Sequence, residues 1–219
     1  PPPMPAPAAT APEPSSAGAA ISIAGMSVHL PGAVDSLSAL WQRMHTALDL
    51  LDTLPDPDGR GEPFMHRKGI LSANGLPSMR VLRALGLHAD AAARLGAEQR
   101  VMLELAVSAL QDAGIDAAAH RTGVFVSSSS LHHPKQDLDT VRTETPDVYF
   151  AEEVAHDKDY VATAVAYHLG LTGPAEAVQT ACSSSLVAIV RGVHALRLGL
   201  CEVAICGGVS LSPDLPLRK

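Results

Sequence analysis

The sequence has few aromatic residues and no excess of positive charge. Only 3% of its 219 residues are Phe, Trp or Tyr, and 16 basic side chains stand against 23 acidic ones, giving a formal net charge of −7. Proteins bind nucleic acid through basic surfaces that neutralise phosphates and aromatic rings that stack on bases. The composition therefore argues against nucleic acid as a partner.

Uninterrupted apolar runs and cysteines are also scarce. The most apolar stretch, residues 186–209, is broken by Arg191, His194, Arg197 and Glu202, whereas a membrane-spanning helix needs about 20 largely uncharged residues. Three cysteines are an odd number in a chain without a secretory start, which predicts no disulfide framework. We expect a soluble cytoplasmic protein with no membrane partner.

The chain contains enough apolar residues, 47%, for a globular core. Residues 1–20, "PPPMPAPAATAPEPSSAGAA", have the composition of a semi-extended linker. Residues 21–219 are expected to form the folded part. The chain starts with proline, and "LSPDLPLRK" follows an apolar run at its end. We therefore expect it to be a piece of a longer polypeptide.

Strand-like and helix-like patterns alternate through residues 21–219. We expect buried strands at residues 20–26, 122–127, 176–180 and 201–209, and helices at residues 35–48, 97–113, 157–170 and 183–198. Residues 52–77 are rich in Pro and Gly and predict a long loop, and the serines from Ser127 predict a turn. The alternation predicts a layered α/β architecture with helices packed on a sheet.

Two of these helices carry apolar faces that we expect to be buried. In residues 35–48 the face consists of Leu37, Leu40, Trp41, Met44 and Leu48, with Asp35 or Ser36 available as a cap. In residues 183–198 it consists of Leu186, Ile189, Val190, Val193 and either Leu196 or the stem of Arg197. The second helix would then be a rigid core element that fixes the residues just before it.

Cys182 lies just before that second helix, in "AVQTACSSSLVAIVRGVHALRLG". The free N–H groups and the dipole of a helix N-terminus favour an anion, so a thiolate there could attack a thioester and its oxyanion could find backbone donors. The simpler alternative is a buried core cysteine, because free cysteines are often buried. His194 lies about 18 Å further along the helix and cannot reach the thiol.

The motifs around Cys182 resemble a known family. "TACSSSLVA" (residues 180–188) resembles the active-site signature of β-ketoacyl synthases, specifically the ketosynthase domains of modular type I polyketide synthases. Further motifs follow in family order: "IAGMSVHLPGA" (23–33) with Trp41, "EQRVMLELAVSALQDAGID" (98–116), "RTGVFV" (121–126), "DKDYVATAVAYHLGLTGPA" (157–175) and "AICGGVSLSP" (204–213). The resemblance implies a thiolase-like layered α/β fold, with helices on a mixed sheet, of which this chain is the first half.

The resemblance also implies a function. Cys182 would accept an acyl chain as a thioester and condense it with a malonyl-type extender, with loss of CO₂. Substrates would arrive on the phosphopantetheine of acyl carrier protein, with no cofactor or metal bound by the chain. The complete domain would be a homodimer beside other synthase domains. Two histidines and a lysine from the family's second half would complete the site, so the chain alone is expected to be inactive.

Two departures from the family pattern and two alternatives accompany this interpretation. Gly96-Ala97-Glu98 stands where members usually carry Met-Asp-Pro, and Gln179 stands where many carry Asp. One alternative is a non-catalytic truncated segment used for docking or dimerisation. The other is a different enzyme of the same fold that uses coenzyme A thioesters.

Overall fold

A parallel sheet forms the centre of the described structure. The computed structural model describes residues 20–53, 67–71, 95–129, 150 and 153–211. Within these residues, β3 (Thr122–Ser128) lies between β4 (Ala175–Ala177) and β5 (Val203–Val209), and both neighbours run parallel to it. Every residue of β3 is buried, as expected for a central strand covered on both faces.

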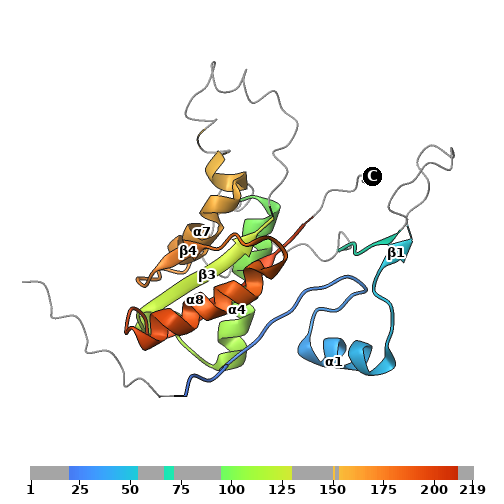
Figure 1. The fold of residues 1–219 in the computed structure, drawn as a ribbon, viewed down its shortest axis with the longest axis horizontal. Coiled ribbons are helices and arrows are strands. Elements are labelled where there is room, and N and C mark those ends of the chain that lie inside the picture. The colour runs from blue at the N-terminus through green and yellow to red at the C-terminus, as the bar shows by residue number, and fades with distance from the viewer. Residues whose placement is uncertain (1–19, 54–66, 72–94, 130–149, 151–152, 212–219) are drawn as a thin grey trace, which may run out of the picture.

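Helices cover both faces of this sheet. The side chains of Val124 and Val126 pack against α4 (Ala97–Ala113) and α7 (Val161–His168). Phe125 points to the opposite face and packs against α8 (Ser184–Arg197), because successive side chains alternate across a strand. Figure 1 shows α8 in front of the sheet and α4 behind it. The expected layered α/β architecture is confirmed.

Most of the expected elements of this core are present, with shifted ends. Residues 97–113 form α4, and Gly114 ends it in the left-handed region at φ 65°. The expected helix at residues 157–170 is a short 3-10 turn (Lys158–Tyr160) followed by α7. A 3-10 turn (Ala181–Ser183) likewise precedes α8. A third such turn, Ala117–Ala119, leads into β3.

Two expectations about the strands were wrong. Ser127 and Ser128 do not form a turn but continue β3, pairing in register with Gly208 and Val209 of β5. Residues 20–26 are not a strand: Ile23 is 77% exposed. They lie across α4 instead, where the Met26 N–H donates to Asp112 at 2.9 Å and the Ser27 hydroxyl donates to the Leu105 carbonyl at 2.7 Å. Apolar content alone could not reveal that these residues contact a helix and not a strand.

The segment before this core contains α1 (Leu37–Thr46), capped by Ser36, whose side chain accepts from the Ala39 N–H. No residue of α1 is buried in the described structure, and Trp41 is 65% exposed, so the expected burial of its apolar face was wrong. The predicted loop contains a short antiparallel pair, β1 (Asp52–Thr53) with β2 (Arg67–Lys68). This antiparallel pair is a separate two-stranded sheet, whereas the strands of the central sheet, β3, β4 and β5, are parallel.

Two further points concern boundaries and membranes. Nearly all of the predicted linker, residues 1–20, lies outside the described residues, so the division at residue 20 stays a prediction. In the part of the chain that the structure describes, no helix has the length and apolar character needed to cross a membrane.

The close approach of α8 to the sheet generates a prediction. Gly192 of α8 is buried, and a Cβ there would overlap the sulfur of Cys206 and lie 3.2 Å from the Cβ of Ala204. We expect Gly192→Ala to lower the free energy of unfolding by about 1–3 kcal/mol in chemical denaturation, because overpacking forces α8 away from the sheet. Gly207→Ala is the control, since nothing lies within 4 Å of its added Cβ. Equal stability of the two variants would contradict this packing.

Candidate active site

Cys182 lies at the carboxyl edge of the parallel sheet. It sits in the 3-10 turn Ala181–Ser183, after β4 and immediately before α8, and its side chain is exposed. The sequence interpretation placed it at this strand-to-helix junction, and the structure confirms that placement. The crevice beyond the carboxyl ends of strands is where ligands bind in open α/β sheets. The alternative of a buried core cysteine does not fit the described chain.

Hydroxyl groups tie together the turn that carries Cys182. The Thr180 N–H donates to the Ser184 hydroxyl at 2.8 Å, and that hydroxyl donates to the Ala181 carbonyl at 2.7 Å. Ser183 donates to the Thr180 carbonyl at 2.8 Å. Ser183 makes no side-chain capping bond to α8. The serines thus secure the backbone on either side of Cys182 and do not cap the helix that follows.

The backbone just before Cys182 is strained. Ala181 has φ 55°, in the left-handed region, which costs a residue with a Cβ about 1–2 kcal/mol. This conformation turns the chain sharply out of the sheet direction and into α8. Strain of this kind persists only where surrounding contacts hold it, and it clusters at functional sites.

Small residues hold α8 against the sheet behind Cys182. The buried residues of the helix are Ser184, Ala188, Gly192 and Ala195. The expected buried face was wrong for Leu186, which is 69% exposed, and for Ile189 and Val190, which are also exposed, whereas Leu196 is partly buried and packs against the core. Spacing at 3–4 residues fits both faces of the helix. The face with small side chains is the buried one, because small side chains allow closer packing on β3 and β5.

The other two cysteines are enclosed in the core, as the sequence predicted. Burial raises the pKa of the Cys201 thiol. Burial, with the nearby Cys201 as a smaller cause, raises the pKa of Cys206 to about 11. Both thiols therefore stay protonated at neutral pH, and a protonated thiol is a poor nucleophile. Of the three cysteines, Cys182 is the exposed one.

Groups that could assist Cys182 are sparse in the described residues. His194 is exposed on α8, and the sequence spacing keeps it away from the thiol. No group of three His, Cys, Asp or Glu side chains within the described ranges could hold a metal ion. Burial lowers the pKa of His168 at the end of α7, but this histidine is separated from Cys182 along the chain by β4.

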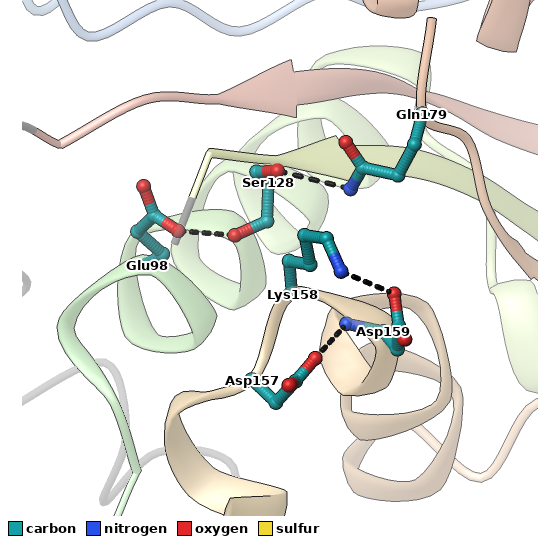
Figure 2. A network of polar contacts seen from close by, with 6 residues as sticks. All are labelled: Glu98, Ser128, Asp157, Lys158, Asp159 and Gln179. Carbon is teal, nitrogen blue, oxygen red and sulfur yellow. Dashed lines mark hydrogen bonds and ion pairs between the residues drawn. The ribbon is translucent and has the colours of Figure 1, made fainter. Parts of the chain in front are cut away.

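The sequence interpretation missed a buried carboxylate near the site. Glu98, in the first turn of α4, is 8% exposed. It accepts from the Ser128 hydroxyl, and the Ser128 carbonyl in turn accepts from the Gln179 side chain at 3.0 Å. Figure 2 shows this chain of contacts beside a separate pair, Lys158 with Asp159 at 3.1 Å. The available signal was an acidic residue in the first turn of the helix.

Comparison with known proteins identifies relatives of the whole region. Residues 19–214 match the family model described as the beta-ketoacyl synthase N-terminal domain. The chain is 31% identical over 207 residues to the pikromycin polyketide synthase component PikAII of Streptomyces venezuelae, and 34% identical over 212 residues to the mycoketide-CoA synthase of Mycobacterium tuberculosis. The alignments cover 87% and 88% of this chain but 5% of each relative, so the chain spans about a twentieth of their length.

Solved structures show the same architecture. Ketosynthase twelve of the bacillaene polyketide synthase of Bacillus amyloliquefaciens superimposes with a TM-score of 0.71 at 22% identity, covering 90% of this chain and 34% of that one. The oxazolomycin ketosynthase domain OzmH KS7 of Streptomyces albus JA3453 gives a TM-score of 0.68 at 27% identity, covering 87% and 34%. The chain thus spans about a third of each solved ketosynthase.

The different settings of the three thiols predict an order of alkylation. At about pH 8 only about one Cys206 thiol in a thousand is ionised when its pKa is about 11. We expect iodoacetamide to modify exposed Cys182 at least about a hundredfold faster than Cys206, as measured by peptide mass spectrometry over time. In denatured protein the difference should disappear. Equal rates in the folded protein would contradict the described burial.

The hydroxyl of Ser184 provides a second prediction. Ser184→Ala removes the acceptor of the Thr180 N–H and one of two donors to the Ala181 carbonyl, which keeps its bond from the Ser184 backbone N–H. We expect the free energy of unfolding to fall by about 1–3 kcal/mol, because two part-buried hydrogen bonds, each worth about 0.5–1.5 kcal/mol, are lost. Chemical denaturation measures the change. Ser185→Ala, at the exposed neighbouring position, serves as the control. A loss as large in the control would refute the role of the Ser184 hydroxyl.

Proposed function

The chain belongs to the β-ketoacyl synthase family and has its thiolase-like layered α/β fold, and from this we propose that Cys182 is its acyl-accepting nucleophile. The observation that carries the proposal is the position of this one exposed thiol, in a strained turn at the carboxyl edge of the sheet and directly before α8. An accessible sulfur on a fixed backbone is what nucleophilic catalysis requires.

The proposed reaction has two stages. In the first, the Cys182 thiolate attacks the carbonyl carbon of an acyl thioester on acyl carrier protein. The new S–C bond forms, the old one breaks, and the carrier leaves as a thiolate that takes up a proton. The amino end of α8 favours the oxyanion of the intermediate, because its backbone N–H groups and dipole point toward the turn.

In the second stage, a malonyl-type thioester on acyl carrier protein loses CO₂ to give an enolate. The enolate carbon attacks the acyl carbon on Cys182, a carbon–carbon bond forms, and the cysteine thiol is released. The family resemblance assigns two histidines and a lysine to this step. Because the chain spans about a third of the solved ketosynthases, we propose that they lie in the part of the domain outside this chain, and that the chain alone does not condense substrates.

The surroundings of the domain follow from the same proposal. The polyketide synthase relatives are many times longer than this chain, which supports adjacent synthase domains in the protein that carries it. We propose a homodimeric complete domain in the cytoplasm that receives its substrates on the phosphopantetheine of acyl carrier protein. The proposed chemistry uses the cysteine thiol directly and requires no cofactor held by this chain.

Acyl loading tests the proposal. The complete domain is incubated with an acyl thioester of acyl carrier protein, and the acyl mass increment is located by intact-mass and peptide mass spectrometry. We expect Cys182→Ala to abolish loading while changing the free energy of unfolding by less than about 1 kcal/mol, because the side chain is exposed. Cys206→Ala, at a partly enclosed thiol, should retain loading.

Two results would count against the proposal. Undiminished loading of the Cys182→Ala variant would remove the nucleophile assignment. Loading from acyl-coenzyme A but not from acyl carrier protein would instead favour an enzyme of the same fold that uses coenzyme A thioesters.

A further inference from the structure

The carboxylate of Glu98 binds donors from two elements that are far apart in the sequence. One of its oxygens accepts from the Ser129 hydroxyl and from the Leu211 N–H, both at 2.8 Å. Its other oxygen accepts from the Ser128 hydroxyl. Ser128 ends β3, and Leu211 follows β5. A single carboxylate therefore joins the start of α4 to the chain at the carboxyl ends of two neighbouring strands.

This carboxylate is connected to the turn that carries Cys182. Ser128 donates its hydroxyl to Glu98 and accepts at its backbone carbonyl from the Gln179 side-chain nitrogen, at 3.0 Å. Gln179 lies three residues before Cys182. Just before it, the Val178 N–H donates to the Val126 carbonyl at 2.8 Å, so the chain follows β3 up to the point where the turn begins. Figure 2 shows Glu98, Ser128 and Gln179 in line.

The three contacts favour a carboxylate over a neutral polar side chain. An ionised carboxylate has acceptor sites on both oxygens, so it can receive two hydroxyl protons and one N–H at once. A glutamine could keep the Ser129 and Leu211 bonds on its oxygen, but its nitrogen would have to donate to the Ser128 hydroxyl, which reverses that bond and removes the ionised acceptor. Hydrogen bonds to an ionised acceptor are also about twice as strong as neutral ones.

We propose that Glu98 is a positioning residue for Cys182: it fixes the end of β3 so that the Ser128 carbonyl holds Gln179, and Gln179 fixes the approach of the chain to the strained Ala181 and the thiol. This role rests on the proposed function of Cys182 as the acyl acceptor. Glu98 itself acts through Ser128 and Gln179 and not on the substrate. The strain at Ala181 makes such a hold necessary, because an unrestrained turn would relax.

The test is single-turnover acylation of Cys182 in the complete domain, with butyryl-N-acetylcysteamine as the thioester. We expect Glu98→Gln to lower the maximal acylation rate constant about tenfold, because misplacing a reacting group by about 1 Å costs up to a hundredfold. The half-saturating thioester concentration and the final amplitude should not change. A merely structural role would lower the amplitude, which reports the folded fraction, and leave the rate constant of the folded molecules as it was.

Two further variants complete the design. Glu104→Gln is the matched control, because Glu104 lies on the same helix outside this network, and its rate constant should equal that of the parent. Gln179→Ala breaks the last link at an exposed position, so it should fold even if the Glu98 variant does not. We expect it to lower the rate constant similarly, and the double variant Glu98→Gln with Gln179→Ala to be no slower than the slower single variant, since coupled residues are not additive.

The outcomes separate this proposal from the function on which it rests. Parental rate constants in both Glu98→Gln and Gln179→Ala, or multiplicative losses in the double variant, would overturn the positioning role while leaving the nucleophile assignment intact. If the parent protein itself is not acylated, the proposed function fails. The positioning role is then judged by the rate of iodoacetamide alkylation at Cys182: a change of about threefold or more in both variants supports it, and unchanged rates overturn it.

Discussion

Hydrogen bonding of β3 to a parallel strand on each side is the constraint on which the described structure depends. All seven residues of β3 pair with β5, and residues 124–126 also pair with β4. Because the strands are parallel, their carboxyl ends meet at one edge, and the chain leaves β4 there to enter the turn with Cys182. The pairing thus places the turn with Cys182 at the edge of the sheet where β3 and β5 also end.

Packing on the two faces of β3 is unequal, and this difference shapes the site. Valines of β3 meet the apolar sides of α4 and α7, whereas Phe125 meets the small residues of α8. Small residues such as Ala188 and Gly192 let α8 lie close to the sheet, which holds the residues before it rigidly. The same arrangement turns Leu186 and its larger neighbours outward.

The described structure encloses one carboxylate that has hydrogen-bond donors around it and two thiols that have few. Glu98 remains among three hydrogen-bond donors, so its burial is compensated. Cys201 and Cys206 are enclosed with little compensation, and burial raises their pKa values. The fold thereby keeps two thiols protonated and leaves the third, Cys182, exposed. Burial, and not the amino-acid type, separates the candidate nucleophile from the structural cysteines.

Local patterns predicted the elements of the core well. The helix at residues 97–113 and its end at Gly114 follow from apolar spacing and from a glycine that adopts positive φ easily. The junction at Cys182 follows from a strand-like run that changes to a helix-like run. The family was recognisable because its motifs occur in order along the chain. Each helix, junction or motif is recognised within about 20 residues of sequence, where spacing alone carries the information.

The contacts between distant residues were decided only by the tertiary structure. The sequence did not show that residues 20–26 lie on α4, which face of α8 is buried, or that Glu98 meets Leu211, 113 positions away. By itself the sequence determined the order of helices and strands, the family, and the place of Cys182 before a helix. The folded chain decided which side chains are enclosed and which donors surround Glu98, because burial depends on neighbours that the strand pairing brings together.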